Sequence, residues 1–503
     1  MHKNVFRILS RLFIYRLFLN HKAPAHLPFV PHDPWPGNAV EGNRILLGDI
    51  NIGGNLVAIS DLWDPEINST TYADLHSFAW LRDLRSVGDN SARKVSRQLI
   101  QNWIARNKNW RAKAWAPAVV GRRLSIWISL YDFFGSSADD AFRSKFLKSI
   151  TKQYRHLQNS YCTCEVSIDQ LHCLKGLIFT AAALFDDKQK LELYLGKFCA
   201  HLVNHLESDG MYKSRRVDHQ LSILRDLIDI RSLLKLIGHE VPRDLQQNIN
   251  LIAPVIRLFR HGDGGLAGFG DGEQVSRQTV DMALSIADVR GRAPIRVNRS
   301  GFERCTGRNS LLLVNAGRPM SGADDYSIGL LNFEWSYGRE RIIVRSDSLI
   351  GDDEPLLSHQ ALGAANVRSD RQQADGDTLL ELSLDYKDDN HLLNFKRKLF
   401  LAGKANNLRG QDYLLFDRDT HSAQRFVFCH GTQMELLGNG KGVDIILPSK
   451  LRWQLLTAGV EKLEIDDILL PRESKQPLPC LYLMRRHTKN DPATLKWAFH
   501  KAG

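Results

Sequence analysis

The sequence predicts an α+β protein in which a helical N-terminal half precedes a C-terminal antiparallel β-sandwich. Up to residues 259–267, with the sequence FRHGDGGLA, apolar residues recur at helical spacing. After about Phe302 they occur in short β-rich runs that are separated by Gly, Asn and Asp turns. Helices first and strands second indicate two layers of different class in one chain.

A series of helices is predicted in the first half. One apolar stripe is followed by Gly238, which suits a helix end, and by Pro242, which suits a first helical turn. The stripe consists of Leu227, Ile230, Leu234 and Ile237. Similar segments cover 74–107, 120–134, 141–159, 168–185 and 188–206. Successive helices without intervening strands are typical of a bundle, a solenoid or a ring of helical hairpins.

Before these helices, residues 21–54 carry five prolines and are predicted to be an extended connector without regular helix. In the second half, residues 336–339 are predicted to turn two strands into a hairpin. The predicted strands cover 310–314, 328–335, 341–344, 379–386, 392–401, 413–416, 425–430, 443–447 and 451–456. The expected domains are an N-terminal segment with its connector (1–60), a helical domain (61–295) and a sandwich domain (296–503).

Composition limits the class of protein. At 503 residues the chain can bury at least two cores, and its seven scattered cysteines favour free thiols over a disulfide framework. A net charge of +11 favours a polyanionic partner. Nucleic acid is disfavoured because no recognition motif accompanies the charge. No run of apolar residues is long enough to predict a transmembrane helix.

Residues 5–19 are apolar but are interrupted by Arg7, Arg11 and Arg16, which breaks the apolar stretch that a secretory signal requires. Two interpretations of this amphipathic segment stay open. It either packs its apolar face on the body of the protein or lies on a membrane surface as a peripheral contact.

Four strings together resemble heparinase II/III-like proteins, in particular a bacterial branch of poorly assigned function. They are Ala114-Trp115-Ala116-Pro117, Gly121-Arg122-Arg123-Leu124 with Trp127 and Tyr131-Asp132-Phe133, Leu174-Lys175-Gly176-Leu177-Ile178-Phe179, and the 259–267 run. The resemblance extends from about Leu62 to the C-terminus. It implies an incomplete α/α toroid followed by an antiparallel β-sandwich.

The resemblance also implies a function. Enzymes of this family are polysaccharide lyases, which cleave uronic-acid polymers by β-elimination and need a base, an acid and a group that neutralises the carboxylate. The alternative is a non-catalytic protein that binds anionic polysaccharide during envelope polysaccharide assembly. The family is associated with the cell envelope and periplasm, and a cytoplasmic protein is the alternative location.

When the family's catalytic residues are matched to this chain one by one, several positions carry a different residue. Where enzymatic relatives have an Asn-His pair, this chain has Ile168 and Asp169. Relatives have an Asp-Gly-Gly-His segment followed by a catalytic Tyr, and the corresponding positions here are Tyr212 and His219. The two residues are candidates for an exchanged acid/base pair, and loss of catalysis is the alternative. His359 matches a His that is common in the family, and a surface histidine is the competing interpretation.

Basic side chains supply the candidate substrate contacts. Arg215 and Arg216, with Lys213, lie in the same loop as Tyr212 and could bind carboxylate or sulfate. A solvated loop is the alternative. Arg122 and Arg123 precede Trp127 and Tyr131 on a helix, where aromatic faces could hold sugar rings or pack into the core.

His261 and Asp263, in the Gly-rich loop between the two halves, are further candidates for catalysis and substrate binding. In the alternative interpretation, Asp263 bonds the local backbone and the glycines supply positive φ. No cofactor is required for β-elimination. Zinc in relatives is held by two His and an Asp, and here Asp347 and His430 match two positions, whereas Tyr326 or Ser327 stands at the first. A structural zinc is therefore expected to lack a ligand.

Overall fold

The computed structural model describes residues 15, 18–52, 55–63, 69–164, 167–269, 275–317, 331–350, 366–387, 392–404, 406–470 and 476–502. The chain divides into two compact units. The helical unit comprises Met1–His205, Ser222–Asn250 and Met282–Asp288, and the sheet unit comprises Leu206–Leu221, Leu251–Asp281 and Val289–Gly503. The domain boundaries expected from the sequence, at residues 60 and 295, stay a prediction.

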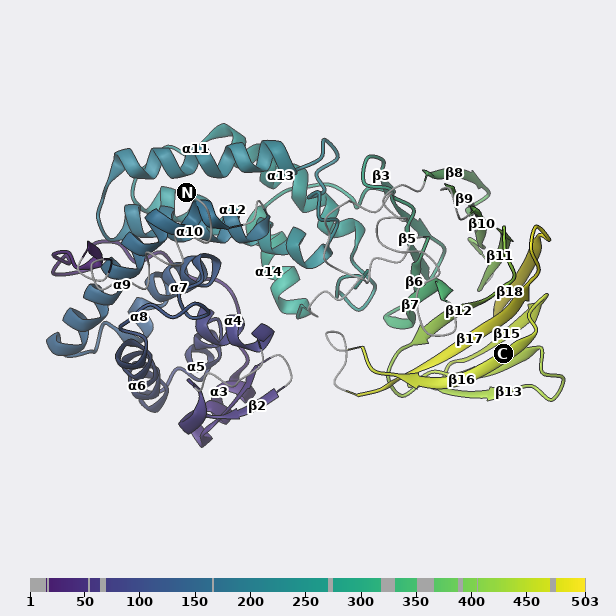
Figure 1. Ribbon diagram of the computed structural model, residues 1–503, viewed down its shortest axis with the longest axis horizontal. Helices are drawn as coiled ribbons and strands as arrows, with labels where there is room; N and C mark the ends of the chain where they lie inside the picture. Colours follow the sequence, from purple (N-terminus) through teal and green to yellow (C-terminus); the bar gives the residue numbers. More distant parts are fainter. Residues whose placement is uncertain are drawn as a thin grey trace. The chain divides into compact units, whose positions relative to one another are not determined.

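Helices dominate the first part of the chain, drawn from purple to teal in Figure 1. In chain order the helices are α3 (Ala39–Leu47), α4 (Ser69–Ser77), α5 (Leu81–Val87), α6 (Asn90–Arg106), α7 (Pro117–Ser129), α8 (Tyr131–Phe134), α9 (Asp140–Ser160), α10 (Ile168–Ala183), α11 (Lys188–His205), α12 (Val217–Leu236), α13 (Arg243–Leu258) and α14 (Arg277–Ala287). Short 3-10 turns lie at η1 (Ile59–Asp61) and η2 (Tyr161–Thr163). Within the described part of the chain, no helix combines the length and apolar character needed to cross a bilayer.

Left-handed backbone positions divide segments that the sequence pattern joined. The predicted helix at 74–107 is three helices, because the backbone takes positive φ at Phe78 (65°) and Gly88 (74°) between them. Gly238 also has a positive φ of 68° directly after α12, which confirms the predicted helix end. Apolar periodicity continues across such breaks, so periodicity alone could not locate them.

The connector differs from its prediction in two ways. It is extended through Pro36, but the proline-free residues that follow form α3, whose first turn is capped by the Asn38 side chain. The antiparallel strands β1 (Asp49–Ile52) and β2 (Asn55–Ala58) come next. In addition, Trp35 is 1% exposed and donates its indole N–H to Asp229 Oδ1 at 2.8 Å. The connector is therefore part of the core of the helical unit.

Most of the N-terminal segment predicted at 5–19 lies outside the described residues. Tyr15 and Phe18, near its end, contact α9: a 2.8 Å hydrogen bond joins Tyr15 Oη to His156 Nδ1, and the Arg155 guanidinium lies 4.9 Å from the Phe18 ring centre. Leu19 is 2% exposed. The described end of the segment is thus packed on the helical unit.

Two of the four strings that carried the family resemblance meet where α7 and α10 cross. A Cβ on Gly121 would lie 2.2 Å from the backbone oxygen of His172, and one on Gly176 would lie 2.5 Å from the Cα of Gly121. Only hydrogen fits at these positions, so the two helix backbones come into direct contact. The glycines of the two motifs are explained by this crossing.

Strands occupy the second part of the chain, drawn in green to yellow in Figure 1. Among the described residues they form two eight-stranded antiparallel sheets, in the orders β13-β14-β15-β18-β11-β10-β9-β8 and β16-β17-β12-β7-β6-β5-β4-β3. The strands are β3 (Arg296–Val297), β4 (Phe302–Thr306), β5 (Ser310–Asn315), β6 (Phe333–Tyr337), β7 (Glu340–Ile350), β8 (Asn366–Ala374), β9 (Asp377–Lys387), β10 (Leu392–Leu401), β11 (Asn407–Phe416), β12 (Thr420–Phe428), β13 (Gln433–Leu436), β14 (Gly442–Ile446), β15 (Arg452–Ala458), β16 (Lys462–Ile468), β17 (Leu478–His487) and β18 (Ala493–Lys501).

Aromatic side chains from both sheets fill one common core. Phe333 of β6 stacks on Trp497 of β18 at 5.6 Å, and Trp335 of β6 packs edge-on against Trp453 of β15 at 4.8 Å. The pairing of Tyr337 with Glu340 confirms the predicted β6–β7 hairpin. The two sheets therefore form the predicted sandwich.

Candidate functional site

The 209–220 segment, which carries the candidate acid/base pair, is anchored to the sheet unit at its start. The Asp209 carboxylate accepts the backbone N–H groups of Arg299 and Ser300 at 2.8 and 3.0 Å and also the Ser300 hydroxyl. Gly210 follows with φ of 86°, which permits a tight turn. Gln220 spans the turn, because its side chain accepts from the Tyr212 N–H at 2.8 Å and donates to the Gly210 carbonyl at 2.5 Å.

The two members of the predicted pair lie in different surroundings. Tyr212 is 3% exposed. His219 is partly buried, its Nδ1 lies 3.0 Å from the Ser214 hydroxyl, and its backbone N–H donates to Asp218 at 2.9 Å. His219 thus stays within reach of solvent while Tyr212 is enclosed.

Arg215 points into the sheet unit. Its backbone has φ of 57°, its side chain is buried, and it donates from Nη2 to the Asn315 side-chain oxygen. The guanidinium also lies 4.7 Å from the Phe302 ring centre. Burial lowers the pKa of Arg215 to about 10, against a smaller opposing effect of Asp209. As placed, this side chain supports the segment from within and does not face a substrate.

Arg216 and Lys213 lie nearer the surface and are both partly buried. Arg216 forms a two-pronged ion pair with Asp218, at 3.1 Å from Nε and 2.6 Å from Nη2. Burial raises the pKa of Asp218, but the Arg216 hydrogen bond and the His219 charge more than offset it and hold the pKa below its ordinary value. Asp218 therefore joins Arg216 and His219 in one polar group.

His261 and Asp263 have separate partners within the sheet unit. His261 is enclosed, with Nε2 at 3.1 Å from Glu334 and Nδ1 at 3.0 Å from the Ser336 hydroxyl. Burial lowers the pKa of His261, although Glu334 acts in the opposite direction. Asp263 accepts the Gly265 N–H at 2.8 Å and pairs with Arg341 at 2.8 Å.

The alternative interpretation of this loop, a local turn, is therefore the one that the geometry matches. The matched histidine His359 lies outside the described residues.

The helix-borne arginines belong to the helical unit. Arg123 is fully buried and donates to the His76 and Ala114 carbonyls and to the Gln153 side chain. This location contradicts a direct substrate contact for Arg123. Trp127 is also fully buried, so the aromatic residues of α7 pack into the core. Arg122 differs, because its side chain is 38% exposed and lies 3.6 Å from Asp74.

Of the matched zinc positions, Asp347 carries ion pairs instead. Asp347 on β7 lies between two guanidinium groups, with Oδ1 at 2.7 Å from Arg345 and Oδ2 at 2.6 Å from Arg425. His430 is exposed beyond the end of β12, and Tyr326 and Ser327 lie outside the described residues. Within the ranges that the structure describes, no three His, Cys, Asp or Glu side chains are grouped to hold a metal ion.

A buried charge cluster, which the sequence reasoning missed, joins α10 to α12 in the helical unit. Lys175 donates to Asp226 at 2.7 Å and to Asp229 at 2.5 Å, and His172 Nδ1 lies 3.2 Å from Asp226. Burial lowers the pKa of Lys175, but the two carboxylates raise it above its ordinary value. The sequence offered one sign of this cluster, a single lysine inside the apolar 168–183 helix. A lysine that is buried requires a paired anion.

These two units define a protein with the heparinase III fold, an incomplete α/α toroid followed by an antiparallel β-sandwich. The solved structure of heparinase III aligns with a TM-score of 0.69 at 12% identity, over 99% of this chain and 91% of that one. A heparan sulfate lyase HepC mutant from Pedobacter heparinus aligns with a TM-score of 0.58 at 13% identity, over 100% and 89%. Identities this low show the fold and leave the activity open.

One sequence relative complements the structural neighbours. The chain is 26% identical over 495 residues to FtsZ-localized protein C from Caulobacter vibrioides, covering 89% of this chain and 85% of the relative. No family model matches the chain.

Proposed function

We propose that this protein uses a lyase-type fold to bind an anionic polysaccharide without cleaving it. The observation that carries the proposal is the enclosure of Tyr212 and Arg215, which are 3% exposed each. A base in β-elimination must come within hydrogen-bond distance of the C5 proton, and the neutralising cation must touch the sugar carboxylate. Neither group meets this condition as the segment is folded.

The start of α10 supports the same conclusion. Ile168 and Asp169 occupy the places of the Asn-His pair, and Asp169 is exposed at the N-terminal turn, where a carboxylate interacts favourably with the helix dipole. An aspartate is a weaker base than a histidine near neutral pH. The chain therefore offers no replacement imidazole at this position.

Binding requires less than catalysis. Lys213, Arg216 and His219 lie at or near the surface of the 209–220 segment, which Asp209 and Gln220 hold in place. A rigid cationic loop on a chain with a net charge of +11 attracts a polyanion over several ångströms. Such binding weakens as salt is added.

The test measures binding and cleavage on the same samples. Isothermal titration with a panel of uronate polymers is expected to show binding that Lys213→Ala/Arg216→Ala weakens about tenfold or more. Lys145→Ala on α9, in the helical unit, is the control and is expected to bind like the wild type. Unchanged affinity in the double variant would contradict the proposed site.

A lyase is the second candidate, and the partly exposed imidazole of His219 favours it. β-Elimination creates an unsaturated uronate that absorbs in the ultraviolet. Absorbance that rises with any polymer, and that is lost in His219→Ala and Tyr212→Phe, would establish catalysis and overturn the non-catalytic proposal. A flat trace alongside measurable binding is the result that we expect.

The sequence relative, FtsZ-localized protein C, supports a different cellular role. In this role the chain localises with FtsZ, as the relative's name says of that protein. The two roles predict different compartments. A protein that binds envelope polysaccharide works in the cell envelope or periplasm, and one that localises with FtsZ works in the cytoplasm. Alkaline phosphatase fused to the C-terminus is active only outside the cytoplasm, so its activity decides between the locations. We expect an active fusion, and an inactive one together with co-localisation with FtsZ would replace the polysaccharide role.

A further inference from the structure

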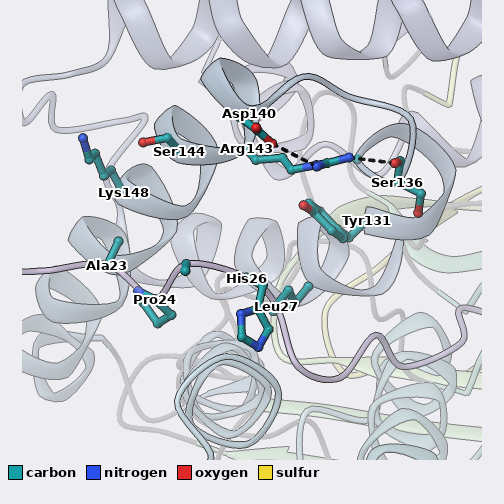
Figure 2. Close-up of a pocket in the computed structure, with 12 residues that line it drawn as sticks. Ala23, Pro24, His26, Leu27, Tyr131, Ser136, Asp140, Arg143, Ser144 and Lys148 are labelled. Atoms are coloured by element: carbon teal, nitrogen blue, oxygen red, sulfur yellow. Dashed lines mark hydrogen bonds and ion pairs between the residues drawn. The ribbon is translucent and has the colours of Figure 1, made fainter.

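A cavity of about 550 Å³ lies in the helical unit, and none of its lining residues is one that the sequence singled out for catalysis. Its walls come from residues 23–27 of the connector and from α8 and α9 (Figure 2). Cavities of this volume hold small ligands, including a disaccharide. Because the connector supplies one wall, the cavity depends on the packing of the proline-rich segment against the helices.

The lining carries the hydroxyl groups of Tyr131, Ser136 and Ser144. Tyr131 is 9% exposed: its ring stacks on Phe146 at 5.5 Å, and a Cβ on Gly135 would lie 2.3 Å from it, so the ring offers no free face and Tyr131 contributes its hydroxyl to the lining. Ser136 and Ser144 are exposed and carry their hydroxyls on the same lining. His26 of the connector also lines the cavity (Figure 2). Several hydroxyls on one lining are hydrogen-bond partners that suit the hydroxyls of a sugar.

The charged groups of the lining are not balanced. Arg143 pairs with Asp140 at 3.1 Å and donates to the Ser136 carbonyl at 3.0 Å, which fixes its guanidinium beside the cavity. Lys148, one helical turn beyond Ser144, has no hydrogen-bond or ion-pair partner among the residues that the structure describes. One positive charge is therefore left for a ligand to neutralise.

We propose that this cavity binds a carboxylated sugar, with the carboxylate at Lys148 and Arg143. The sugar hydroxyls bond Ser136 and Ser144. The site shares no residue with the 209–220 segment, so it is a second binding site that goes beyond the proposed function and does not depend on it.

The experiment is isothermal titration of the full chain with digalacturonate and, separately, with the neutral disaccharide maltose. Lys148→Ala is expected to weaken digalacturonate binding about tenfold or more, since it removes a charge-assisted hydrogen bond. Ser144→Tyr, which fills the cavity, is expected to abolish binding. Lys145→Ala, a neighbouring exposed lysine outside the lining, is the matched control and is expected to bind like the wild type.

Three results in the wild type and the cavity variants would overturn the proposal. They are no binding of digalacturonate by the wild type, equal affinity for maltose, or unchanged binding in both Lys148→Ala and Ser144→Tyr. Lys213→Ala/Arg216→Ala separates this site from the 209–220 segment. Disaccharide binding lost in that double variant and kept in Lys148→Ala would assign it to the segment, whereas the reverse pattern supports the cavity whether or not the segment binds polymer.

Discussion

Replacing Lys175 with methionine tests whether the buried charge cluster holds α10 to α12. Methionine is similar in length but has no charge, so Lys175→Met leaves Asp226 and Asp229 without the ammonium that contacts them at 2.7 and 2.5 Å. Removing one partner of a buried ion pair costs about 3–5 kcal/mol, because the remaining charge stays buried without compensation. We expect the helical unit to lose that amount of unfolding free energy.

The size of the loss should depend on pH. Burial raises the pKa of Asp226, but Lys175 and His172 more than offset this and place it below its ordinary value of 3.8. A depressed carboxyl pKa stabilises the fold above the ordinary pKa, and this contribution is lost as pH falls through the folded-state pKa. The difference between wild type and Lys175→Met should therefore shrink below about pH 4.

The assay must resolve one unit of a chain that has two. Unfolding of such a chain is not a two-state process, so hydrogen exchange of peptides from α10 and α12 is measured in increasing urea. Lys190→Met is the matched control, because its side chain is 47% exposed and its pair with Asp187 lies at the surface. Adding Asp226→Asn to Lys175→Met should recover part of the loss. A loss of less than about 1 kcal/mol of unfolding free energy in Lys175→Met would refute the reasoning.

Other predictions concern packing, protonation and thiol chemistry. Gly121→Ala should cost about 3 kcal/mol of unfolding free energy in the helical unit, measured by the same hydrogen exchange in urea, whereas Gly196→Ala on α11, where a Cβ meets nothing within 4 Å, should gain up to about 1 kcal/mol; equal effects would contradict the close helix crossing. Burial lowers the pKa of His76 from 6.5 to about 3. Protonation of its unfolded form should therefore remove about 2 kcal/mol of stability at pH 5, and His76→Gln should flatten the pH profile. The Cys164 and Cys173 sulfurs lie 3.3 Å apart. Hydrogen peroxide should oxidise both thiols to one disulfide with release of two waters, and an intact-mass measurement that shows no loss of two hydrogens would exclude it.

Much of the fold could be predicted from the sequence because burial in each half follows a simple period. Strand β10 (Leu392–Leu401) was predicted with its observed bounds, since its apolar residues mark a covered strand. Strand β8 was missed because it lies at a sheet edge and its residues are exposed or half-buried, so no alternation of apolar and polar residues is required. The helix α3 was missed because the extended connector predicted from the nearby prolines included residues 39–47, which contain no proline.

The candidate site was less predictable, since residue type does not reveal the direction of a side chain. Arginines such as Arg123 and Arg215 are typical of anion-binding sites. Here, however, backbone carbonyls in the core hold Arg123, and Asn315 holds Arg215. Arg215 also has a positive φ, a backbone conformation that normally favours glycine, so the residue type gave no sign of it. Lys148 was not selected because its relevance depends on the connector that faces it.

The location of the strings that carry the resemblance explains how a chain can keep the heparinase III fold whether or not it keeps the chemistry. Gly121 and Gly176 set the distance between α7 and α10, and Lys175 ties α10 to α12. The fold requires each of these residues whether or not a substrate binds, because each is fixed by packing or by a buried charge. Groups that act only on substrate, such as an exposed imidazole, carry no such constraint. A chain that loses the reaction therefore keeps the motifs of the fold, and the resemblance is a guide to the architecture before it is a guide to the activity.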